Sequence, residues 1–99
     1  MTIKSDLMNN FHIYFLNEMN AEVIPNKSKY TPTFQNYITA LVALANTRVS
    51  TDAEAIANKN AMMAIYQKIV NYCSRRALSV LLEELLSAVQ TIKTRTAGI

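Results

Sequence analysis

The fold of this chain is decided by residues 50–74, which read STDAEAIANKNAMMAIYQKIVNYCS. Near its start, Thr51 and Glu54 stand at the spacing of a capping box, which satisfies the first amide groups of an α-helix. Apolar residues then recur at the spacing that gathers them on one face of a helix. These residues are Met62, Ile65, Ile69, Tyr72 and Cys73. The stretch therefore predicts an amphipathic helix over residues 52–74.

A first helix is expected over residues 3–23, with Thr2 or Ser5 as its N-cap. Its apolar stripe recurs mainly at four-residue spacing. The stripe comprises Ile3, Leu7, Met8, Phe11, Phe15, Leu16, Met19 and Val23. Pro25 is expected to end this helix, because the residue before a proline is excluded from the α region. A polar loop is expected over residues 25–30.

A second and a fourth helix flank the central one. Thr31 followed by Pro32 is a capping residue before a proline at the first helical position, and it predicts a helix over residues 32–48. One unbroken helix over the remainder of the chain would be about 66 Å long at ~1.5 Å per residue, which is unusual for a small domain. A break is therefore expected between residues 74 and 79, with Ser79 capping a last helix over residues 78–94.

Four amphipathic helices with short connections pack most simply as an antiparallel bundle. The expected fold is therefore an all-α antiparallel four-helix bundle in a single domain, residues 1–99. The alanines of the third helix are expected in its core, and a groove or a dimer interface is the alternative. They are Ala53, Ala55, Ala57, Ala61 and Ala64.

Composition excludes several classes of function. The single Gly excludes a glycine-rich phosphate loop, and the single Cys excludes a disulfide framework or a cysteine-cluster zinc site. His12, the only histidine, is expected as a hydrogen-bonded structural residue, and Cys73 as a small buried apolar one. The adjacent carboxylates Glu83 and Glu84 point about 100° apart on a helix, so they cannot share a substrate proton. No catalytic residue, metal site, cofactor or small-molecule substrate is expected.

The net charge of +3 is unevenly placed. No acidic residue occurs between residues 55 and 82, whereas that segment contains two lysines and two arginines. Four residues share one broad side of the third helix and are candidates for binding an acidic partner. They are Lys68, Tyr72, Arg75 and Arg76. With Tyr72 as a stacking ring, the same set would permit weak, salt-sensitive binding of nucleic acid.

A cytoplasmic location is expected. Polar and charged residues interrupt the N-terminal region, so no export signal is recognised. The longest uncharged stretch, residues 30–47, contains many polar residues, and its continuously apolar part is shorter than the ~20 residues that a membrane span needs.

The C-terminal third resembles the enterocin A-type (pediocin-like, class IIa) bacteriocin immunity proteins. Residues 68–72, KIVNY, are similar to a basic–aliphatic–Val-Asn-Tyr stretch in the third helix of that family. Residues 83–85, EEL, resemble the opening of its last helix, and residues 95–99, RTAGI, resemble the segment that closes it. The resemblance covers about thirty residues, and in the N-terminal half little matches beyond the loop at Lys29 and Tyr30.

The resemblance implies a non-catalytic four-helix protein kept inside a producer cell. Such a protein recognises a bacteriocin-occupied mannose phosphotransferase permease and prevents a lethal pore from the cytoplasmic side. The basic surface that would face the inner leaflet or an acidic loop comprises Lys68, Arg75, Arg76, Lys93 and Arg95. A small phage- or plasmid-type regulator that binds nucleic acid or a host protein is the alternative. A helical subunit of a larger assembly, including a homodimer, is a third hypothesis.

Overall fold

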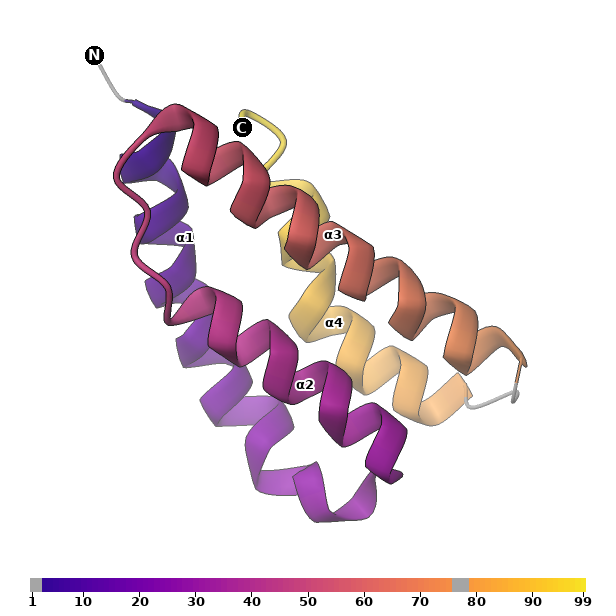
Figure 1. The fold of residues 1–99 in the computed structure, drawn as a ribbon. Helices are drawn as coiled ribbons and strands as arrows, with labels where there is room; N and C mark the ends of the chain where they lie inside the picture. Colours follow the sequence, from indigo (N-terminus) through magenta and orange to yellow (C-terminus); the bar gives the residue numbers. More distant parts are fainter. Residues whose placement is uncertain (1–2, 76–78) are drawn as a thin grey trace.

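A bundle of four α-helices makes up the part of the chain that the structure describes (Figure 1). The computed structural model describes residues 3–75 and 79–99, and of residues 79–86 only the helical backbone. The helices are α1 (Lys4–Glu18), α2 (Pro32–Ala45), α3 (Asp52–Arg75) and α4 (Ser79–Arg95). A π-helical turn, η1 (Met19–Val23), and a 3-10 helix, η2 (Ile24–Lys29), connect α1 to α2. Successive helices run in opposite directions, so the predicted all-α bundle is confirmed.

The first helix, α1, ends at Glu18, and the π-helical turn η1 continues it to Val23, the expected end; the loop predicted after it is wrong. Residues 24–29 form η2, with Pro25 in its first turn, where the missing N–H of proline costs no hydrogen bond. The predicted N-cap is also wrong, because Ser5 lies buried within α1, and Thr2 is outside the described residues. The backbone N–H of Lys4 instead donates to Asp52 Oδ1, 3.1 Å away at the start of α3.

The second helix is shorter than the predicted range 32–48, since α2 ends at Ala45. The chain then leaves the helix and runs along α1 to the start of α3 (Figure 1). Asn9 of α1 holds this segment: its Nδ2 donates to the Val49 carbonyl at 2.9 Å, and its Oδ1 accepts from the Val49 N–H at 3.1 Å. Pairing with Asn9 thus replaces the hydrogen bonds that a last helical turn would have made.

The other helix boundaries agree with the sequence prediction. Thr31 Oγ1 accepts from the N–H of Phe34 at 3.4 Å, and Thr51 Oγ1 accepts from the N–H of Glu54 at 3.1 Å. At the start of α3, the Glu54 carboxylate also accepts a hydrogen bond of 2.9 Å from the N–H of Ser50, which completes the capping box. The helices α3 and α4 run in opposite directions, so they are two separate helices as expected; the side chain of Ser79, the expected cap, lies outside the described residues.

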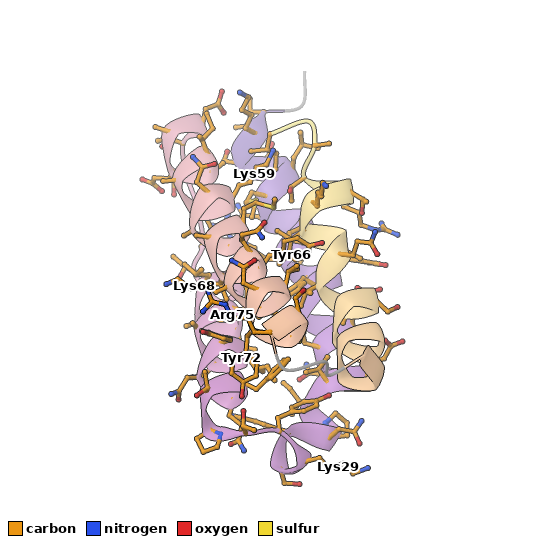
Figure 2. The ribbon with its side chains drawn as sticks, turned by 90° about the vertical axis from the view of Figure 1, so that its right-hand side faces the viewer. Lys29, Lys59, Tyr66, Lys68, Tyr72 and Arg75 are labelled. Atoms are coloured by element: carbon orange, nitrogen blue, oxygen red, sulfur yellow. The ribbon has the colours of Figure 1, made fainter. Side chains whose placement is uncertain are left out.

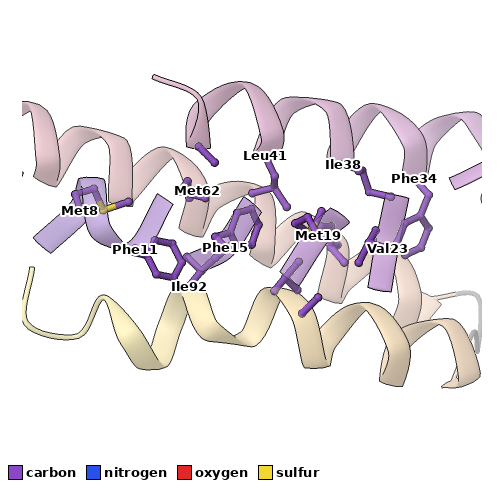
Figure 3. Packing of buried hydrophobic residues seen from close by; sticks show 14 of the residues in the cluster. Met8, Phe11, Phe15, Met19, Val23, Phe34, Ile38, Leu41, Met62 and Ile92 are labelled. Atoms are coloured by element: carbon purple, nitrogen blue, oxygen red, sulfur yellow. The ribbon is translucent and has the colours of Figure 1, made fainter. Parts of the chain in front are cut away.

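Apolar side chains from all four helices meet along the axis of the bundle (Figure 3). The largest of those fully buried are Phe15, Phe34, Met8, Met19, Ile38, Leu41, Met62, Ile69 and Ile92. The methionines Met8, Met19 and Met62 therefore fill the core, as their spacing predicted. Ile3 and Leu7, predicted in the stripe of the first helix, are instead 44% and 39% exposed, because the buried face of α1 turns through Ser5, Met8 and His12.

The prediction that the alanines of α3 pack in the core is wrong for most of them. Ala55 is buried, whereas Ala53, Ala57 and Ala64 are exposed and Ala61 is half-buried. The core face of α3 passes instead through Ala55, Asn58, Met62, Ile69 and Cys73. The remaining alanines therefore lie outside the core, where their small side chains project little from the surface of α3.

Candidate functional site

A shallow pocket lies between the second half of α3 and the neighbouring α2. Its volume is about 220 Å³, and its lining comprises Tyr37, Lys68, Asn71, Tyr72 and Arg75. Figure 2 shows Lys68, Tyr72 and Arg75 along the second half of α3, with Lys59 further toward the start of the helix. We call this set of five residues the basic pocket. It unites three of the residues predicted as a binding site, Lys68, Tyr72 and Arg75.

Tyr72 is the fixed part of the basic pocket. Its ring packs edge-on against Phe34 and against Tyr37, with ring centroids 5.2 and 6.2 Å apart. Its hydroxyl shares a hydrogen bond of 2.8 Å with Thr31 Oγ1, the cap of α2. Because aromatic pairs of this geometry and a cap residue hold it, Tyr72 joins α3 to the start of α2 and sets the floor of the pocket.

The polar groups around the pocket favour an anion. Lys68 and Arg75 are exposed and, within the part of the chain that is described, neither forms a salt bridge. Asn71 Oδ1 accepts from Gln67 Nε2 at 3.1 Å, so the group that Asn71 offers to a ligand is its NH₂ donor. Among the residues that the structure describes, none that lines the pocket is acidic. An ammonium, a guanidinium and an amide donor at one hollow are typical of a site for carboxylate or phosphate.

Two of the remaining predicted site residues lie in another part of the bundle. Arg76 is outside the described residues, and Lys93 and Arg95 belong to the last turn of α4, near the end of the bundle where α3 begins. The Arg95 guanidinium lies over the Tyr14 ring, 3.7 Å from its centroid, in a cation–π contact. Tyr14 in turn donates to Glu18 Oε1 at 2.7 Å, and this bond raises the pKa of Tyr14. Arg95 therefore contributes to the packing of α4 on α1, away from the basic pocket.

His12 and Cys73 are both buried and are not brought together. His12 Nε2 lies 2.7 Å from Asn58 Oδ1, and burial lowers the pKa of the imidazole despite this bond. Cys73 follows Asn58 by fifteen residues on the same helix, about 22 Å along its axis. Burial also raises the pKa of the Cys73 thiol. The structural histidine and the buried cysteine expected from the sequence are thus confirmed.

The described residues contain neither a cluster of metal ligands nor a helix that could span a membrane. No three histidine, cysteine or carboxylate side chains there approach closely enough to hold a metal ion. None of the helices in the same part of the chain combines the length and the hydropathy needed to cross a bilayer.

Sequence reasoning did not include Tyr37 among the candidate binding residues, although this residue of α2 lines the basic pocket. A second hollow of about 380 Å³ lies further along, where Leu44 and Val49 lie beside Ala57 and Ala61, and we call it the apolar hollow. Arg48 and Glu54 also line it. The groove that the sequence analysis gave as the alternative to core packing of the α3 alanines agrees with this hollow, because Ala57 and Ala61 line it.

Comparisons of this chain with protein-family models, with curated proteins and with solved structures find no match.

Proposed function

We propose that this protein is a non-catalytic binding protein that holds an acidic partner at the basic pocket, and that it serves as a bacteriocin immunity protein. In this role it would act at the cytoplasmic face of the membrane and protect its producer from one pediocin-like peptide. The partner would be the bacteriocin-occupied sugar permease that the family resemblance implies.

One observation carries the proposal. The KIVNY motif at residues 68–72, on which the resemblance mainly rests, contributes three of the five residues that line the basic pocket. Lys68, Asn71 and Tyr72 thus belong both to the motif and to the hollow, while Ile69 of the same motif is buried in the core. A motif that divides in this way combines a structural role with an exposed, cationic recognition surface.

The environment of Tyr72 favours an acidic protein surface over a stacked nucleic-acid base. Stacking requires an open ring face, whereas this ring already contacts Phe34 and Tyr37 and its hydroxyl bonds to Thr31. Lys68 and Arg75, seven residues apart, remain as two exposed cations about 10 Å apart along the helix axis. Their chemistry suits two carboxylates on a partner.

The test is protection of a sensitive strain. Expression of the protein should protect that strain against one peptide in a panel of pediocin-like bacteriocins, measured as the inhibitory concentration. The double variant Lys68→Gln/Arg75→Gln should lose most of this protection. Lys59→Gln, which removes a cation of the same helix outside the pocket, is the matched control and should protect as the wild type does.

Both variants must be folded for the comparison to hold, and circular dichroism with thermal unfolding checks this. Absence of protection across the whole panel would overturn the immunity role. Protection by the double variant equal to that of the wild type would show that the basic pocket is not the binding surface.

A further inference from the structure

The basic pocket and the apolar hollow lie on one seam between α2 and α3. Tyr37 and Leu44 are seven residues apart on α2, and Ala61 and Lys68 are seven residues apart on α3. Since seven residues are about two helical turns, the two hollows follow one face of each helix. The seam therefore has an apolar end near the start of α3 and a cationic end near its last turns.

Small residues lie between the two hollows of the seam. Ala64 lies two turns after Ala57 and one turn before Lys68, and it is exposed. Ala40, on the α2 side, is half-buried and falls midway between Tyr37 and Leu44. Because a methyl side chain projects little, another helix can approach α3 closely along this line.

We infer that the seam between α2 and α3 is the docking groove for an amphipathic helix of the partner, with its apolar residues in the apolar hollow and its carboxylates at the basic pocket. This inference rests on the proposed function and specifies which element of the partner is bound. Charge and polarity argue for this occupant. Among the described residues, the lining of the basic pocket contains two cations and no acidic side chain, so the cationic end of the seam would repel a basic helix.

The spacing of the seam sets the geometry of the bound helix. From Ala57 to Arg75 the groove extends over eighteen residues of α3, or about 27 Å. A partner helix of roughly five turns would span it, with two or three aliphatic residues at one end and two carboxylates at the other. Recognition of a helix through anchors spaced three, four and seven residues apart is a recurrent mode of peptide binding.

The direct test is a titration of the isotopically labelled protein with a synthetic peptide, followed by NMR. The probe is a helical peptide of about eighteen residues with leucines at spacing three and four in one half and two glutamates seven residues apart in the other. Shifted amide signals confined to α2 and α3, with a Kd on the order of 100 µM or tighter, would support the inference. A peptide of the same composition in scrambled order and one with lysines in place of the glutamates are the controls.

Two variants separate the ends of the groove. Lys68→Gln/Arg75→Gln should weaken binding of the probe by about tenfold, because both carboxylates lose their cation. Ala57→Gln fills the apolar hollow and should also weaken binding about tenfold, as expected when a side chain blocks an apolar anchor. Ala53→Gln is its matched control: it changes an exposed alanine one turn earlier, outside the hollow, and should leave the Kd unchanged.

Several results would overturn the inference. The inference is overturned if the amide signals do not shift at a peptide concentration of about 1 mM, or if the shifted signals belong mainly to α1 and α4. It is also overturned if the scrambled peptide binds with the same Kd. Binding to vesicles of anionic phospholipid that Lys68→Gln/Arg75→Gln abolishes and Ala57→Gln does not affect would also overturn it, in favour of a membrane surface.

The cell assay distinguishes this inference from the proposed function. If Ala57→Gln protects the sensitive strain fully while Lys68→Gln/Arg75→Gln does not, the immunity role is supported and the docking of a helix in the groove is contradicted. If the wild type protects against none of the bacteriocins but binds the probe peptide in the groove, the docking groove is supported and the immunity role is contradicted.

Discussion

Replacing Asn58 by alanine should destabilise the bundle more than any other single change of a polar side chain on α3. Asn58 joins three helices, because its Nδ2 donates to the Leu44 carbonyl at 3.1 Å and its Oδ1 lies 2.7 Å from His12 Nε2. Since the amide NH₂ is committed to a carbonyl, Oδ1 is the acceptor, and we assign the imidazole proton to Nε2 on this network. His12 and Asn58 are only 4% and 7% exposed.

The magnitude follows from the bonds that are lost. Two hydrogen bonds contribute about 1 kcal/mol each, and a buried N–H left without an acceptor costs about 1–3 kcal/mol more. The Leu44 carbonyl keeps a partner, because it also accepts from the N–H of Thr47 at 3.2 Å. The better helix propensity of alanine raises the free energy of unfolding of the variant by about 0.5 kcal/mol. The expected net loss in the free energy of unfolding is therefore about 3 kcal/mol, or a fall in Tm of about 15 °C for a chain of this length.

Thermal and urea unfolding, followed by circular dichroism, measure this change. Asn60→Ala is the matched control, since it makes the same replacement at an exposed position of the same helix and should leave Tm within about 2 °C of the wild type. A double-mutant cycle with His12→Phe isolates the pair and should give a coupling of about 1–2 kcal/mol. Additive effects of the two replacements, within ~0.5 kcal/mol, would refute the assignment of this bond as a stabilising contact.

The same pair predicts how stability depends on pH. Burial lowers the pKa of His12 below its usual value of 6.5, so the unfolded chain binds a proton at higher pH than the folded one does. This contribution to stability is therefore complete above pH 6.5 and declines as the pH falls below 6.5 through the folded-state pKa. Urea titrations at several pH values should show the decline in the wild type and a flatter profile in His12→Phe. Parallel profiles in the two proteins would contradict the prediction.

Three further replacements or reactions test other parts of the structure. Asn9→Ala removes both hydrogen bonds to the Val49 backbone, and it should lower the free energy of unfolding by about 2 kcal/mol and accelerate amide exchange at Val49. Met62→Ala leaves a cavity in a fully buried position and should cost about 2–5 kcal/mol in urea unfolding, whereas Met63→Ala, at the margin of the core, should cost less. The Cys73 thiol is 1% exposed and its pKa is raised, so it should react with a thiol reagent only as fast as the chain unfolds. Rapid reaction of the native protein would show that this part of α3 is open.

Features that depend on neighbours in the chain could be predicted from the sequence. The caps at Thr31 and Thr51 bond to amides three residues later, so a local pattern was sufficient to locate the starts of α2 and α3. Lys68 and Arg75 could be placed together for the same reason, because they share one face of a single helix. The core positions of the methionines also followed from helical spacing alone.

Features that depend on contacts between distant segments needed the tertiary structure. Asp52 accepts from the N–H of Lys4, and Asn9 binds Val49, so residues about forty or more positions apart decide where α1 begins and where α2 ends. No local pattern can report such partners.

The sequence by itself therefore determined the number of helices, most of their boundaries and the basic face of α3. Only the packing of the helices decided which further residues complete that face. Tyr37 joins the basic pocket because α2 lies beside α3, and Arg95 is separated from it because α4 runs antiparallel and places its basic last turn against Tyr14. Helical periodicity is a property of a few consecutive residues, whereas a site between helices exists only after the chain has brought distant residues together.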